Sequence, residues 1–182
     1  IVENKEHVTS IPFKQKGDLI YLIGESHNDI SSSQYLVHIH GVEASPVPHF
    51  DLEEEFSNQE MVRTLIQEGV VRSAHDVSEG GLFVALMEKA MHSGLGFDVT
   101  TDASIRADAW LFGESQSRIV VSVSSEMEDR FIDLMMPNGV EFELLGHVTK
   151  GSVRIDDVEW GEAVQYRSIY DEGLDHVLSP NA

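Results

Sequence analysis

The architecture of this 182-residue chain is set by Val70-Val71-Arg72-Ser73-Ala74-His75-Asp76-Val77-Ser78-Glu79-Gly80-Gly81-Leu82. Residues 70–74 predict a short strand, and apolar residues at helical spacing begin at Leu82. The glycine pair Gly80 and Gly81 lies between the two, where the free N–H groups of a helix start favour an anion and glycines let a ligand approach the backbone. The stretch therefore predicts a strand–turn–helix unit that can receive a phosphate group.

The turn also carries two carboxylates, Asp76 and Glu79. Mg²⁺ usually takes one or two protein carboxylates and keeps several waters, so these side chains are candidates to hold a Mg²⁺ that arrives with a nucleotide or phosphate. A structural interpretation competes with this one. In it, Ser78 caps the helix and the glycines only allow tight packing.

Strands and helices alternate on both sides of this unit, which predicts one α+β domain over residues 1–182, with a layered, mixed β-sheet flanked by helices. Asp51 stands at a helix start, with Glu54 three residues on as in a capping box. The predicted strands are 19–23, 35–40, 70–74, 118–123, 141–148 and 153–155, and the predicted helices are 52–70, 82–92, 104–111, 126–136 and 161–178.

Composition excludes several classes of function. Lys and Arg number 12 against 32 Asp and Glu, for a net charge of −20, and no basic stripe suits a phosphate backbone, so neither nucleic acid nor an anionic membrane is expected as a partner. The absence of cysteine excludes disulfides, thiolate nucleophiles and Cys-ligated metals in this chain. No apolar run approaches the roughly 20 residues that span a bilayer. Because residue 1 is Ile1 and not methionine, we expect a piece of a longer protein.

A second candidate loop precedes the most apolar strand. It reads Gly113-Glu114-Ser115-Gln116-Ser117-Arg118. Hydroxyl and amide side chains at a strand entrance suit a polar ligand, and Arg118 can pair with a phosphate. The alternative is that Glu114 and Arg118 pair with each other or face solvent.

A third loop, residues 24–33, is rich in serine, which binds phosphate or forms ordinary turns. The strand predicted next places His38 and His40 on one face, as a metal pair requires. No third ligand stands at a standard spacing, which argues against a zinc or nickel site.

Together these blocks resemble the C-terminal domain of phosphoribosylformylglycinamidine synthase, a fold like the C-terminal domain of aminoimidazole ribonucleotide synthetase. The resemblance covers nearly the whole chain. The matching blocks are Leu22-Ile23-Gly24-Glu25, Ser33-Gln34-Tyr35-Leu36, residues 73–82, Leu111-Phe112-Gly113-Glu114-Ser115-Gln116-Ser117-Arg118 and Leu145-Gly146-His147-Val148. Related ATP-dependent families share the Asp-x-x-x-Gly-Gly element but less commonly the Gly-Glu-Ser-Gln block, so another member of that superfamily is the alternative.

The resemblance implies a carbon–nitrogen ligase of purine biosynthesis in the cytoplasm. The full enzyme uses ATP and Mg²⁺ to amidate formylglycinamide ribonucleotide with glutamine-derived ammonia. It implies that this piece carries no catalytic residue, holds no cofactor tightly and is inactive alone. Its partners would be the remaining subdomains, a glutaminase subunit or domain and, if the parent is of the short type that the closing helix suggests, a small accessory subunit.

By the same resemblance, Asp76 is the candidate Mg²⁺ ligand of an auxiliary site. The candidate substrate- or nucleotide-binding residues of that site are Ser78, Gly80, Gly81, Glu114, Ser115, Gln116 and Arg118. One departure argues against ligand binding. Where the family commonly reads Glu-Leu-Gly-Gly-Ser, this chain has Asp29-Ile30-Ser31-Ser32-Ser33, and the loss of both glycines restricts the loop backbone. We therefore expect a mainly structural and assembly role, with ligand contact by the loops as the alternative.

Overall fold

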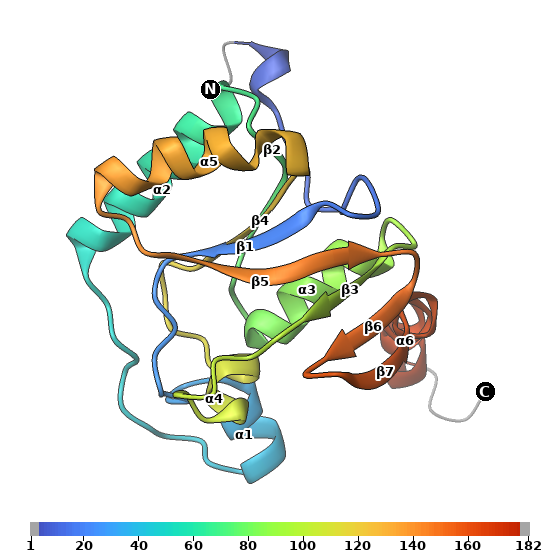
Figure 1. The fold of residues 1–182 in the computed structure, drawn as a ribbon. Coiled ribbons are helices and arrows are strands. Elements are labelled where there is room, and N and C mark those ends of the chain that lie inside the picture. The colour runs from blue at the N-terminus through green and yellow to red at the C-terminus, as the bar shows by residue number, and fades with distance from the viewer. Residues whose placement is uncertain (1–3, 179–182) are drawn as a thin grey trace.

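A computed structural model describes residues 4–178 of the chain (Figure 1). Its centre is a seven-stranded sheet in the order β2-β4-β1-β5-β3-β6-β7. Neighbouring strands run antiparallel except for the parallel pair β3 and β6. This confirms the predicted mixed sheet flanked by helices. The strands are β1 Leu19–Ile23, β2 Val71–Asp76, β3 Gly96–Val99, β4 Ile119–Val123, β5 Phe142–Thr149, β6 Ser152–Ile155 and β7 Val158–Glu162.

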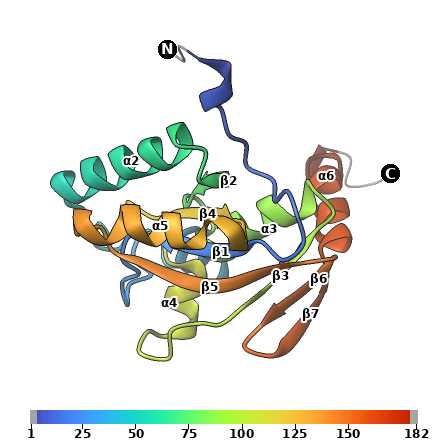
Figure 2. The same cartoon turned by 45° about the horizontal axis from the view of Figure 1, so that its top comes forward.

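The helices lie on both faces of the sheet. They are α1 Gln34–His40, α2 Leu52–Gln67, α3 Gly81–Met91, α4 Ala107–Phe112, α5 Glu128–Met135 and α6 Ala163–Leu178, with short 3₁₀ turns at Lys5–His7, Ser125–Met127 and Met136–Asn138. Figure 2 shows α2 and α5 side by side on one face. None of the helices in the described part of the chain has the length and apolar character needed to cross a membrane.

Two hydrophobic cores follow from the alternation of side chains along the strands. In β1, Ile20 and Leu22 enter the core formed with α3 and α4, whereas Tyr21 and Ile23 enter the core formed with α2 and α5. All four side chains are at most 3% exposed. The short apolar run therefore specifies the predicted strand, which is buried on both faces.

One predicted strand is wrong. Residues 35–40 form helix α1, because the Ser33 side chain accepts a hydrogen bond from the Leu36 N–H at its start and Gly41, in the left-handed conformation, ends it. His38 and His40 are thus two residues apart on a helix and do not share a face. No group of three or more His, Asp or Glu side chains able to hold a metal occurs among residues 4–178.

The last strand was not predicted. β7 precedes α6, which begins at Ala163 and not at residue 161. The hairpin between β6 and β7 turns at Asp156 and Asp157, which both have positive φ, as two-residue hairpin turns require. Two aspartates carry a weaker hairpin signal than Asn-Gly or Asp-Gly, so the local pattern predicts no element over residues 156–160. Residues 179–182, the end of the predicted 1–182 domain, lie outside the described residues.

Candidate functional site

The glycine pair forms the junction between β2 and α3. Gly80, with φ of 85°, is the N-terminal cap of α3, and Ser78 is not. Gly81, with φ of 72°, lies against the end of α4: a Cβ there would stand 2.7 Å from the Gly113 carbonyl oxygen and 2.8 Å from that of Leu111. Gly81 therefore lets α3 approach the α4 terminus closely, which is the tight packing named in the structural interpretation.

Glu114 lies at the start of two helices. One of its carboxylate oxygens, Oε1, accepts a hydrogen bond from the Gly80 N–H at 2.8 Å and another from the Gln34 N–H at 2.7 Å. Gln34 is the first residue of α1, so a single carboxylate serves the N-termini of α1 and α3. A helix N-terminus attracts an anion, and here the protein's own carboxylate supplies that charge.

Arg118 is 2% exposed and holds the second candidate loop together. Its guanidinium donates to the carbonyl oxygens of Gly113 at 2.5 Å and Ser115 at 3.2 Å, and makes a longer contact to the Ser26 hydroxyl at 3.4 Å. Burial lowers its pKa to about 10. Arg118 therefore neither faces solvent nor forms a hydrogen bond with Glu114, which were the two structural alternatives for it.

Ser117, the preceding residue, has a positive φ of 67°. The buried Asn58 side chain of α2 donates to both the Ser117 carbonyl oxygen at 2.9 Å and its hydroxyl at 2.8 Å. The two contacts stabilise a backbone conformation that non-glycine residues seldom adopt. Among residues 115–118, only Gln116 has an exposed side chain.

Three of the eight candidate residues line one cavity, of about 270 Å³. Asp76, Gln116 and Arg118 share it with Glu55 and Gln59 of α2. Asp76 is exposed there, at the end of β2. The other five are placed apart from it: Ser78 is exposed, Ser115 is buried, and Gly80, Gly81 and Glu114 form the helix junction.

The serine-rich loop makes contacts within the protein. Ser32 donates its N–H to the Ser45 hydroxyl at 2.6 Å and its own hydroxyl to the Pro46 carbonyl oxygen at 3.0 Å. Ser32 has a φ of 55°, a conformation that a glycine would adopt more readily. Its polar groups thus bind the coil that follows α1.

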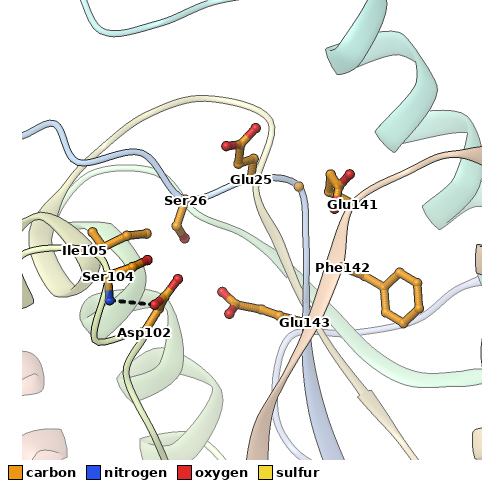
Figure 3. A pocket seen from close by; sticks show the side chains of 9 residues that line it. Glu25, Ser26, Asp102, Ser104, Ile105, Glu141, Phe142 and Glu143 are labelled. Carbon is orange, nitrogen blue, oxygen red and sulfur yellow. Dashed lines mark hydrogen bonds between the residues drawn. The ribbon is translucent and has the colours of Figure 1, made fainter.

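Sequence reasoning missed an acidic cavity of about 310 Å³ (Figure 3). Four carboxylates line it, from Glu25, Asp102, Glu141 and Glu143. Burial raises the pKa of the Glu143 carboxyl, and the charge of Asp102 adds to that effect. Figure 3 shows Asp102 and Glu143 pointing toward one another, with Ser26 above them. No pattern could reveal this site, because three separate segments contribute to it.

Solved structures of other proteins share this fold. The structure of Thermotoga maritima PurL complexed with FGAR aligns with a TM-score of 0.75 at 18% identity, over 90% of this chain and 30% of that one. The E. coli hydrogenase maturation protein HypE aligns with a TM-score of 0.60 at 16% identity, over 84% of this chain and 51% of that one. Identities this low show a common fold alone.

Sequence similarity defines the family. The family model for the AIR synthase related protein, C-terminal domain, matches residues 15–157, and the chain belongs to this family. It is 44% identical over 136 residues to the phosphoribosylformylglycinamidine synthase subunit PurL of Moorella thermoacetica, covering 75% of this chain and 19% of that protein. The Symbiobacterium thermophilum subunit is 44% identical over 151 residues, which cover 81% of this chain and 19% of that protein. The resemblance found in the motifs is confirmed, and the chain spans about a fifth of the length of these curated relatives.

Proposed function

We propose that this chain is the C-terminal AIR-synthase-related part of a phosphoribosylformylglycinamidine synthase, with a mainly structural and assembly role in it. The similarity to PurL subunits over three quarters or more of the chain supports the parent enzyme. The observation that carries the structural role is Glu114, whose carboxylate occupies the two helix N-termini where a phosphate would bind.

The parent protein would be an ATP-dependent carbon–nitrogen ligase of the cytoplasm that receives ammonia from a glutaminase. T. maritima PurL has been solved with FGAR, with ATP and, as PurLQS, in an assembly, which supports a substrate, a nucleotide and partner subunits of these kinds. The remaining subdomains would supply the catalytic residues. This piece alone would be inactive and would bind no cofactor tightly.

If Mg²⁺ binds this piece, Asp76 is the residue to hold it. Its carboxylate is exposed at the end of β2, and Glu55 lines the same cavity, which makes the one or two carboxylates that Mg²⁺ commonly takes. The ion would neutralise phosphate charge there. Gln116 and Arg118 line the cavity too, so the auxiliary nucleotide site is the second candidate function.

Turnover of the full-length synthetase separates the two functions. Under the structural role, Asp76→Ala and Gln116→Ala each keep kcat/KM within about twofold of the parent enzyme. Glu114→Ala, in contrast, lowers the melting temperature. A loss of about tenfold or more in kcat/KM for Asp76→Ala with an unchanged melting temperature would establish ligand contact and refute the structural role.

Titration of this chain with Mg²⁺·ADP gives an independent check. The structural role expects no saturable heat at millimolar nucleotide. Saturable heat that Asp76→Ala abolishes would place a nucleotide on this domain. Glu43→Ala is the matched control, since Glu43 is an exposed carboxylate that does not line the cavity.

A further inference from the structure

Three neighbouring cavities, together called the groove, share lining residues from one to the next between the loop after β1, the start of β5 and α2. The acidic cavity, of about 310 Å³, shares Glu25 and Glu141 with a second cavity of about 220 Å³. That second cavity shares Ser57, Asn138 and Val140 with a third of about 230 Å³. The groove therefore runs from the loop after β1, past the 138–141 turn, to the outer surface of α2.

The two ends of the groove differ in chemistry. At one end, four carboxylates converge without a Lys or Arg among the described lining residues, and Arg118, whose charge acts on Glu143, is buried and engaged with backbone carbonyls. At the other end, Phe56 leaves 65% of its surface exposed beside Met61 and Val140. Met136, adjacent in sequence to the 138–141 turn, is 69% exposed. Leu52, four residues before Phe56 on α2 and therefore beside it on the helix surface, is 69% exposed, and exposed apolar side chains that lie together mark a contact surface.

We propose that this groove receives a segment of the same synthetase from outside these 182 residues, with Lys or Arg at one end and an apolar side chain at the other. The inference rests on the proposed function, because the chain spans about a fifth of its PurL relatives and most of the synthetase, which would supply the segment, lies outside these residues. The charge of the acidic end selects a cationic partner, and the Phe56 end selects an apolar one.

A second copy of this chain fits the groove poorly. Its net charge is −20, with 32 acidic residues against 12 Lys and Arg, so two copies repel at the acidic end. A basic segment gains Coulomb energy at the same place, and the acidic cavity is partly removed from solvent, which strengthens that gain.

Site-specific photo-crosslinking in the full-length synthetase tests the proposal. A benzoylphenylalanine placed at Asn138, which lines two of the three cavities, reports what lies in the groove. The same probe at exposed Ser168 of α6 is the control. Mass spectrometry of the crosslinked peptides identifies the partner.

We expect the Asn138 probe to capture one segment outside the 182 residues that combines Lys or Arg with an apolar residue. The double change Glu141→Gln and Glu143→Gln lowers the yield about fivefold or more, and Phe56→Ser lowers it similarly. The matched controls Glu53→Gln, on the same helix as Phe56 but outside the groove lining, and Ile169→Ser leave it unchanged.

Crosslinking no greater than at Ser168, or only to residues of these 182, shows a solvent-filled groove and overturns the proposal. Capture of a glutaminase, an accessory subunit or a second copy overturns it as well, since the occupant is then different. Synthetase turnover of the parent enzyme is measured in parallel. An active synthetase that gives no crosslink refutes only the proposal that the groove receives a segment. Absence of synthetase activity in the parent enzyme refutes the proposed function.

Discussion

The Glu114 carboxylate accepts a hydrogen bond from the Gly80 N–H at 2.8 Å, across 34 residues of sequence. Because the same oxygen accepts the Gln34 N–H, removing the side chain leaves two helix-terminal N–H groups without this acceptor. We expect Glu114→Ala to lower the free energy of unfolding by about 2–3 kcal/mol, and Glu114→Gln, which keeps an acceptor oxygen, by about 1 kcal/mol. Urea unfolding of the domain measures both.

The control for Glu114 is Glu43→Ala, an exposed carboxylate in the coil after α1. We expect its effect to stay within about 0.5 kcal/mol. Equal effects at positions 114 and 43 would show that the two helix starts do not depend on Glu114.

Gly81 and Gly139 make a matched pair, with φ of 72° and 66°. A Cβ at Gly81 would meet two backbone oxygens of the α4 end, whereas one at Gly139 would meet nothing within 4 Å. Gly139→Ala should cost about 1–2 kcal/mol, the cost of the left-handed conformation alone. Gly81→Ala should cost at least about 2 kcal/mol more, because α3 must move away from α4. Equal losses in chemical denaturation would contradict this packing.

Asn58 is 2% exposed and donates to Ser117 twice. Asn58→Ala leaves the Ser117 carbonyl and hydroxyl without this donor, so we expect a loss of about 2–3 kcal/mol in unfolding free energy and a less ordered backbone at Ser117. Gln59→Ala, the exposed neighbour on α2, is the control. Heteronuclear NMR of the 113–118 loop should show order lost in the Asn58 variant only, and an unchanged loop there would count against this role.

Lys89 is fully buried, and its ammonium group lies near neutral acceptors, the Ile11 carbonyl at 3.1 Å and the Ser73 hydroxyl at 2.9 Å. Burial, with a smaller effect from the charge of Lys14, lowers its pKa from 10.5 to about 7. Between these values the unfolded chain binds more protons than the folded one, so stability rises with pH above about 7. Below that pH the amine is protonated in both states and this dependence ends.

We expect Lys89→Met to remove that rise, which approaches 1.4 kcal/mol per pH unit at most. Urea unfolding at several pH values between about 7 and 9 measures it. The window stops there because burial and the Glu128 contact raise the pKa of Tyr21, which makes stability fall again once unfolded tyrosine ionises near pH 10. Lys150→Met, at an exposed position, is the control, and an unaltered slope in the Lys89 variant would refute the assignment.

Local patterns predicted most of the fold correctly. The apolar runs at 19–23 and 118–123 specify the central strands β1 and β4, and helical spacing after the glycine pair specifies α3. The apolar pattern gave the wrong element at 35–40, because six residues fit the strand period and the helix period equally well. The Ser33 cap and the Gly41 terminus make this segment a helix. The turn of two aspartates before β7 was too weak a signal to separate that strand from α6.

The sequence alone identified the family and the candidate loops, because motif residues adjacent in sequence keep their spacing in any fold. The contacts that those residues make could not be predicted from the sequence. Glu114 finds its partners 34 and 80 positions away, Arg118 turns inward to carbonyl oxygens, and the groove is assembled from α2, the loop after β1 and the start of β5. Hydrogen bonds and cavities between distant segments have no sequence period, so they exist only once the sheet has brought those segments together.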